Sequence, residues 1–168
     1  RRISRGPEDT YILDEKYQAR QDVPPLFIEI YSSYIQRLKN YLSNEINTDY
    51  FDDILLRLAI LGKNIPDDLI DLFFESEGNN QLIENLDETI ESLIECNVLT
   101  ETMNNVGKSS LCFQSAILSK TILSGYSIRR LRPLHRISID AKVKYYKNLN
   151  IDNYEELIEH YNAIGLQD

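Results

Sequence analysis

The sequence predicts a mostly α-helical fold with one small β-hairpin. Apolar residues recur at steps of three and four over most of residues 25–97, which is the period of amphipathic helices. Two short β-prone pieces, 98–102 and 111–113, then flank an Asn-Gly-Lys-rich turn, and helical periodicity returns from residue 115. Helices followed by a two-stranded hairpin are the order of a winged-helix domain. We therefore expect a winged-helix domain with a small β-hairpin, flanked by helices.

The N-terminal part is predicted to be a connector followed by one helix. Residues 1–22 mix charges with Gly6 and Pro7 and show no sustained period, so we interpret them as a connector with a short helix. Pro24 and Pro25 suit the start of the helix that follows. Its apolar stripe comprises Phe27, Ile30, Tyr31, Tyr34, Ile35, Leu38 and Leu42.

The first two helices of the winged-helix domain are marked by their end signals. A strongly apolar helix is predicted over residues 51–61, with Asp49 as its N-cap and Gly62 as its C-terminal stop. Pro66 is predicted to open the second helix. The two aspartates that follow Pro66 would lie at the positive end of that helix dipole.

The third helix is predicted to have one apolar face and one acidic face. Its apolar residues are Leu82, Leu86, Ile90, Leu93 and Ile94, its carboxylates are Glu84, Asp87, Glu88, Glu91 and Glu95, and no Lys or Arg lies between Gln81 and Asn97. In winged-helix domains that bind DNA, this helix enters the major groove. Phosphates would repel these carboxylates at close range, so DNA recognition through this helix is not expected. The acidic face is either a solvated surface or an interface for a basic protein partner.

Three more helices are predicted after the hairpin, beginning near residues 115, 128 and 154. We divide the chain into a connector with a lid-like helix over 1–48, a winged-helix domain over 49–126, and a helical region over 127–168 that resembles the start of a helical array. Because the chain starts with Arg1, we expect it to be part of a longer polypeptide.

Composition narrows the function classes. The chain is 42% hydrophobic and 27% charged, which is ordinary for a folded protein, and its net charge of -9 argues against nucleic acid as a partner. Cys96 and Cys112 have no metal-ligand or redox spacing and are interpreted as small apolar residues of a reducing compartment. No membrane-spanning run and no signal peptide is recognised, so we predict a cytoplasmic location and no contact with a membrane.

A locally basic helix contrasts with the acidic composition. It starts with Arg129, Arg130, Arg132 and His135 and continues with Lys142, Lys144 and Lys147. This helix either binds an acidic neighbour or has a basic solvent face. His135 lies at the margin of a predicted buried stripe and is interpreted as a structural or interface residue. The candidate partner interface comprises Glu84, Glu88, Glu91, Glu95, Arg129, Arg130, Arg132 and His135.

No catalytic, cofactor-binding or metal-binding residues are predicted. The stretch 104–110 ends in Gly-Lys-Ser like a phosphate-binding loop, but Thr102 stands where that motif needs its first glycine. Neither cysteine has a histidine beside it in sequence, and His135 and His160 are too few and too scattered to form a metal site. We therefore predict that this chain is not an enzyme.

Four stretches resemble the region that follows the nucleotide-binding core in STAND-class, AAA-like signalling ATPases. "ARQDVPPLFIEIYSSYI" is similar to the end of the lid, and "LDETIESLIECNVLTE" to the helix that leads into the hairpin. "LCFQSAILSKTILSGYSIRRLRPLHRISIDAKVKYY" is similar to the second hairpin strand and the helices after it. "YEELIEHYNAIG" resembles the first helix of a tetratricopeptide-like array.

The chain departs from that pattern at two places. Asp22-Val23-Pro24 replaces the usual Gly-Asn-Pro, and Ser115 stands where the family often has a histidine that touches the bound nucleotide diphosphate. The resemblance implies that ATP or ADP binds in the parent protein and not in this chain. It also implies that this chain passes a nucleotide-dependent change to a sensor or effector.

Three functions follow as hypotheses. The preferred one is a non-catalytic regulatory and scaffolding module of a larger ATP-dependent signal-transducing protein, which relays conformational change through protein–protein contacts. The second is a stand-alone interaction domain that binds a basic partner through its acidic helix. The third is a winged helix that binds DNA through its hairpin, near Lys108.

Overall fold

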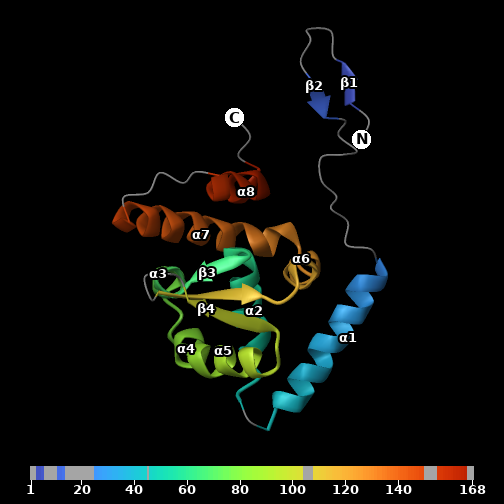
Figure 1. Ribbon diagram of the computed structural model, residues 1–168, viewed down its shortest axis with the longest axis vertical. Helices are drawn as coiled ribbons and strands as arrows, with labels where there is room; N and C mark the ends of the chain where they lie inside the picture. The colour runs from blue at the N-terminus through green and yellow to red at the C-terminus, as the bar shows by residue number, and fades with distance from the viewer. Residues whose placement is uncertain are drawn as a thin grey trace.

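The structure is a computed structural model that describes residues 3–5, 11–13, 25–44, 46–103, 108–149 and 155–165. It is mostly helical, with a small antiparallel sheet surrounded by helices (Figure 1). The winged-helix elements are α2 (Phe51–Leu61), β3 (Asn64–Pro66), α3 (Asp67–Glu77), α4 (Asn80–Glu84), α5 (Leu86–Glu95), β4 (Leu99–Met103) and β5 (Ser109–Phe113). The strand order β3-β5-β4 is that of a winged helix, and the predicted fold class is confirmed.

The sheet has one strand more than predicted. β3 is only three residues long, too short to produce a visible alternation in the sequence. It pairs with β5 so that Ile65 lies opposite Leu111 and Pro66 opposite Ser110. Pro66 lacks an N–H and is tolerated because β3 is an edge strand. The same proline is the N-cap residue of α3, in agreement with the prediction that it opens this helix.

The predicted third helix is divided into α4 and α5. The division falls at Asn85, whose side-chain amide donates a hydrogen bond to the Gln81 carbonyl over 2.7 Å. Asparagine side chains compete with the helix ladder in this way, because they offer the backbone an alternative partner. The predicted apolar face is retained, with Leu82, Leu86 and Leu93 buried and the two isoleucines of α5 half-buried.

The helix-end predictions for α2 are half correct. Gly62 ends the helix with φ at 114°, a conformation that suits glycine. Asp49 is not the N-cap, so that prediction is wrong: the N-cap residue is Tyr50, which makes no side-chain capping bond. The backbone N–H of Asp49 instead donates to Asn47 Oδ1 over 3.1 Å, in a turn that precedes the helix.

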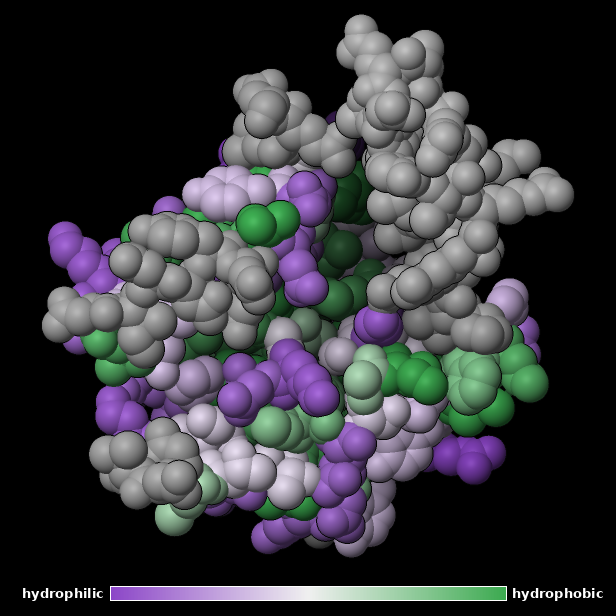
Figure 2. All heavy atoms as spheres, turned by 45° about the horizontal axis from the view of Figure 1, so that its top comes forward, coloured by the Kyte–Doolittle hydropathy of each residue, from purple (hydrophilic) through white to green (hydrophobic). Residues whose placement is uncertain are grey.

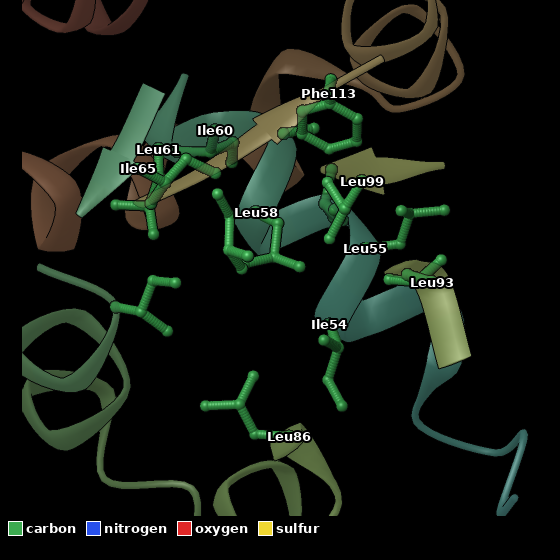
Figure 3. Packing of buried hydrophobic residues seen from close by; sticks show 14 of the residues in the cluster. Ile54, Leu55, Leu58, Ile60, Leu61, Ile65, Leu86, Leu93, Leu99 and Phe113 are labelled. Atoms are coloured by element: carbon green, nitrogen blue, oxygen red, sulfur yellow. The ribbon is translucent and has the colours of Figure 1, made fainter. Parts of the chain in front are cut away.

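The core is built around α2, which is buried on nearly all sides (Figure 3). Leu58 lies near the centre of the view, with Leu86 from α5 below it, Leu93 from α5 to its right and Phe113 from β5 above it. The same cluster includes Leu38 and Leu42 from α1, and Leu131, Leu134 and Ala141 from α7. One core therefore joins all three predicted segments of the chain.

The N-terminal segments differ from the predicted connector. Among the described residues before α1, β1 (Ile3–Arg5) and β2 (Tyr11–Leu13) pair as an antiparallel ribbon, where a short helix was expected. The helix that follows is α1 (Pro25–Leu42). Its apolar stripe is buried only at the C-terminal end, and Phe27, Ile30 and Tyr34 are exposed.

The C-terminal elements are α6 (Ala116–Ser124), α7 (Ile128–Leu149) and α8 (Glu155–Ile164). Figure 1 shows α7 lying across one end of the winged helix, with α8 packed on its outer side. A space-filling view of this end shows hydrophilic and hydrophobic side chains interspersed (Figure 2). Within the described part of the chain, no helix has the length and apolar character needed to cross a membrane.

Candidate protein interface

An open groove of about 360 Å³ lies between α3, α5 and the hairpin, and we call it the acidic groove. Five carboxylates line it: Asp67, Asp71, Asp87, Glu91 and Glu101. Its apolar lining is formed by Ile70, Leu86, Ile90, Ile94 and Leu111. None of the described residues that line the groove is a lysine or arginine.

Helical spacing explains why these side chains share one groove. In α3, Asp67, Ile70 and Asp71 are three and four residues apart, so they lie on one face of the helix. The same spacing places Asp87, Ile90, Glu91 and Ile94 on one face of α5. In the hairpin, Glu101 of β4 is paired with Leu111 of β5 and completes the lining.

Negative charge is concentrated at the α3 side of the groove. The pKa of Asp71 is raised above its ordinary value, first because the carboxyl group is partly buried, and second because neighbouring carboxylates repel its charged form. Glu75, Asp67, Asp68 and Asp87 all contribute to this repulsion. A positively charged group in the groove would therefore be favoured by several carboxylates at once.

Polar contacts join the turn end of the hairpin to α3 and orient one carboxylate of the groove. Lys108 donates a hydrogen bond to Asp68 Oδ2 over 2.6 Å, and this hydrogen bond, together with the charge of Asp68, raises the lysine pKa. Ser109 Oγ donates to Glu101 Oε1 over 2.6 Å and so orients one carboxylate of the lining. The hypothesis of DNA binding through the hairpin relied on Lys108, and in the structure this lysine is paired with a carboxylate of α3. Residues 104–107 of the predicted turn lie outside the described residues.

The predicted acidic residues are all exposed, and of the four glutamates in the candidate interface only Glu91 lines the groove, together with Asp87 of the same acidic face. Glu88 and Glu95 lie elsewhere on α5, and Glu84 belongs to α4. Sequence reasoning missed Asp67, Asp71 and Glu101 as members of the site. The available signal was the Asp-x-x-Ile-Asp spacing of α3, but nothing in the sequence places α3 beside α5.

The three predicted arginines, Arg129, Arg130 and Arg132, are all exposed on α7, and one of them, Arg130, also makes contacts within the fold. Arg130 donates a hydrogen bond to Asp53 Oδ1 over 2.6 Å, and its guanidinium carbon lies 4.7 Å from the centroid of the Tyr126 ring. Arg130 therefore joins the start of α7 to α2 and to the turn between α6 and α7, which gives it a role in holding the fold together.

His135 is buried between α7 and α8, where it meets the second histidine of the chain. His135 Nδ1 and His160 Nδ1 are 2.8 Å apart, and His160 Nε2 is 3.2 Å from Ser138 Oγ. Burial lowers the pKa of both rings, and the charge of Lys142 lowers them further, to about 3 for His160. His135 is only 8% exposed, so it is not available on the surface to a protein partner.

Among the described residues, no cluster of three or more His, Cys, Asp or Glu side chains is arranged to hold a metal ion. Neither Cys96 nor Cys112 forms a disulfide bond among the described residues. Comparisons with protein-family models, with curated proteins and with solved structures gave no match. The function is therefore argued from the acidic groove and from the architecture around it.

Proposed function

We propose that this chain is a non-catalytic regulatory and scaffolding module that acts through protein–protein contacts, and that its acidic groove binds a basic, amphipathic segment of a partner. The observation that carries this proposal is the combination of five carboxylates with an apolar lining on the face formed by α3, α5 and the hairpin. A groove with only carboxylates would suit any cation. The apolar lining adds a preference for side chains that bury hydrophobic surface.

A basic amphipathic helix matches both features of the groove. Its apolar side chains would contact Ile90 and Ile94, which are half-buried and so have surface left to cover. Its lysines or arginines would pair with carboxylates such as Asp87 and Glu91. Such complementarity speeds association and makes it sensitive to salt. Duplex DNA would be repelled from this groove, because its phosphates carry the same charge as the carboxylates.

The wider setting of the module is a larger ATP-dependent signal-transducing protein of the STAND class, in the cytoplasm. Support comes from the sequence resemblance and from the shared core, through which α1, the winged helix and α7 would move together. In that setting the nucleotide-binding core lies outside this chain and supplies the conformational change. A stand-alone interaction domain would use the same groove without such a core. A Walker loop in the parent polypeptide distinguishes the two.

The groove is tested with a synthetic helical peptide that carries leucines at three- and four-residue spacing and lysines elsewhere. The groove variant Asp87→Lys with Glu91→Lys is compared with Glu84→Lys plus Glu95→Lys, which makes the same change in charge at exposed acidic positions outside the groove. We expect Kd to rise at least tenfold, about 1.4 kcal/mol, in the groove variant and by less than about threefold in the control.

Calorimetry at two salt concentrations measures these affinities. A version of the peptide with every lysine replaced by glutamate should not bind. Equal loss of affinity in both charge-reversal variants would contradict the proposal, because it would indicate attraction to the overall charge. Failure of the wild-type chain to bind the basic peptide would contradict it as well.

A further inference from the structure

A second cavity, of opposite charge, lies between the end of α2, α6 and the α7–α8 pair. Its volume is about 720 Å³, against about 360 Å³ for the acidic groove. Three lysines line it, Lys63, Lys120 and Lys142, and Glu159 is the one carboxylate among its described lining residues. We call it the lysine cavity. The chain as a whole has a net charge of -9, so a cavity with more lysines than carboxylates differs in sign from the rest of the protein.

The three lysines come from different parts of the chain. Lys63 directly follows Gly62 at the end of α2, Lys120 belongs to α6, and Lys142 belongs to α7. Lys63 and Lys120 are exposed, whereas Lys142 is only 2% exposed and forms part of the cavity wall. The fold therefore brings together three lysines that are far apart in sequence: Lys63 and Lys120 are separated by 57 residues, and Lys120 and Lys142 by 22.

The rest of the lining mixes apolar side chains with a few polar groups, and the apolar ones are Ala59, Ile60, Leu61, Ala116 and Leu123. Ser119 and Asn64 supply a hydroxyl and an amide, and the rings of His135 and His160 border the same space. The C-terminal end of α2 also contributes to the wall, through residues 59–62. The negative end of that helix dipole amounts to about half a charge, which reduces the positive field of the lysines without reversing it.

We propose that the lysine cavity is a binding site for a small phosphorylated ligand, a phosphate ester of a compact organic molecule. Lysine ammonium groups are point-charge partners for phosphate, and the hydroxyl and amide groups of the lining complete the contacts of its oxygens. The volume lies within the range of about 300–1,000 Å³ for small-molecule pockets, so it has room for an organic group beside the phosphate. This site is separate from the acidic groove and does not depend on the partner proposed for it.

The pKa values of the two histidine rings should change when an anion binds in the cavity, so the rings can be used to detect binding. Burial and the charge of Lys142 lower the pKa of both rings, with the neighbouring ring adding to the effect at His160. The charged groups that line the same space are Lys63, Lys120, Lys142 and Glu159. An anion beside Lys142 offsets part of its charge, so binding should raise the pKa of the rings. The chain has two histidines, so their NMR signals are readily assigned.

The test uses the whole 168-residue chain with three probes: glucose 6-phosphate, inorganic phosphate and glucose. Calorimetry gives Kd, and NMR follows the two histidine rings. Glucose 6-phosphate should bind and shift both histidine signals. Inorganic phosphate should shift the same signals more weakly, and glucose should leave them unchanged. No binding of either phosphate compound up to about 10 mM would overturn the proposal.

A matched pair of variants shows whether binding is at this site. Lys63→Gln with Lys120→Gln removes two exposed lysines of the cavity, and Lys144→Gln with Lys147→Gln removes two exposed lysines of α7 that do not line it. We expect at least a tenfold rise in Kd for the first variant and less than a twofold change for the second. Equal weakening in the two variants would overturn the proposal, since it would indicate non-specific attraction.

Discussion

His160 is hydrogen-bonded at both ring nitrogens, to His135 at Nδ1 and to Ser138 at Nε2. Because the two Nδ1 atoms are 2.8 Å apart, one must carry a proton and the other must accept it. The pair therefore needs both rings neutral, or one ring charged at a high cost in a buried site beside Lys142. This hydrogen bond holds α8 against α7 and joins two residues that are 25 positions apart in sequence.

Acidification should destabilise the protein through these rings. A histidine whose folded pKa is lowered binds a proton more readily when unfolded, so its contribution is complete above pH 6.5 and is lost as the pH falls towards the folded pKa. For His160, with a folded pKa of about 3, the loss at pH 5 is up to about 2 kcal/mol relative to neutral pH. Urea unfolding at pH 7.5 and pH 5 measures it.

The variant His160→Gln isolates this effect from the titration of carboxylates. It should lower stability at pH 7.5 and lose less between pH 7.5 and pH 5 than the wild type does. The same pH dependence in wild type and variant would contradict a buried neutral ring at position 160. Glutamine is chosen because its amide retains hydrogen-bonding capacity without titrating.

At the level of elements, two glycines end the neighbouring helices α2 and α3 in different backbone conformations. Gly62 has φ 114° and ψ -153°, a region that is almost confined to glycine, whereas Gly78 has φ 69° and ψ 23°, which is left-handed helical. A Cβ atom added at either position would meet nothing within 4 Å. Any cost of substitution is therefore conformational and not steric.

Gly62→Ala should cost about 2–3 kcal/mol and Gly78→Ala about 1 kcal/mol. Gly78→Asn should cost less than Gly78→Ala, because asparagine tolerates the left-handed region. Urea unfolding of the three variants gives the comparison, and Gly78→Asn serves as a control for general loss of glycine. An equal cost for alanine at both positions would show that the conformations do not differ in strain.

Periodicity predicted the helices and the hairpin well, and local competition explains what it missed. The apolar stripes of α1, α2, α5 and α7 are visible in the sequence because each helix is long enough to repeat its pattern. β3 has three residues and no repeat. The break at Asn85 depends on one side-chain hydrogen bond to Gln81, which the surrounding period conceals. The N-cap lies one residue later than predicted, at Tyr50, and Asp49 belongs to the preceding turn, where its backbone N–H donates to Asn47 Oδ1.

The candidate sites were less predictable, because they are made between elements. Glu91 was identified from the acidic face of one helix, but its companion Asp71 comes from α3 and Glu101 from the hairpin. Likewise His135 and His160 are isolated in sequence and adjacent in the fold. A single sequence indicates which side chains share a helix face, and does not indicate which faces meet.

On the scale of the whole molecule, two hydrophobic clusters of different size are separated in the described residues. The large one runs from α1 through the winged helix to Leu134 and Ala141 of α7. The small one consists of Ile139, Leu157 and Ile164 and holds α8 to α7. A relay of conformational change requires a body that moves together and an element that detaches from it more easily. In the proposed relay, the large cluster would form the body and the small one would hold the detachable element.

Two leucine-to-alanine substitutions should separate these roles. Leu134→Ala removes packing from the large cluster and should lower the free energy of global unfolding by about 2–5 kcal/mol. Leu157→Ala removes packing from the small cluster and should increase amide hydrogen exchange in α8 while leaving protection in α2 and α5 nearly unchanged. Hydrogen exchange read residue by residue measures both. If Leu157→Ala weakened protection throughout α2 as much as in α8, the last helix would be part of the single cooperative body and could not act as its detachable element.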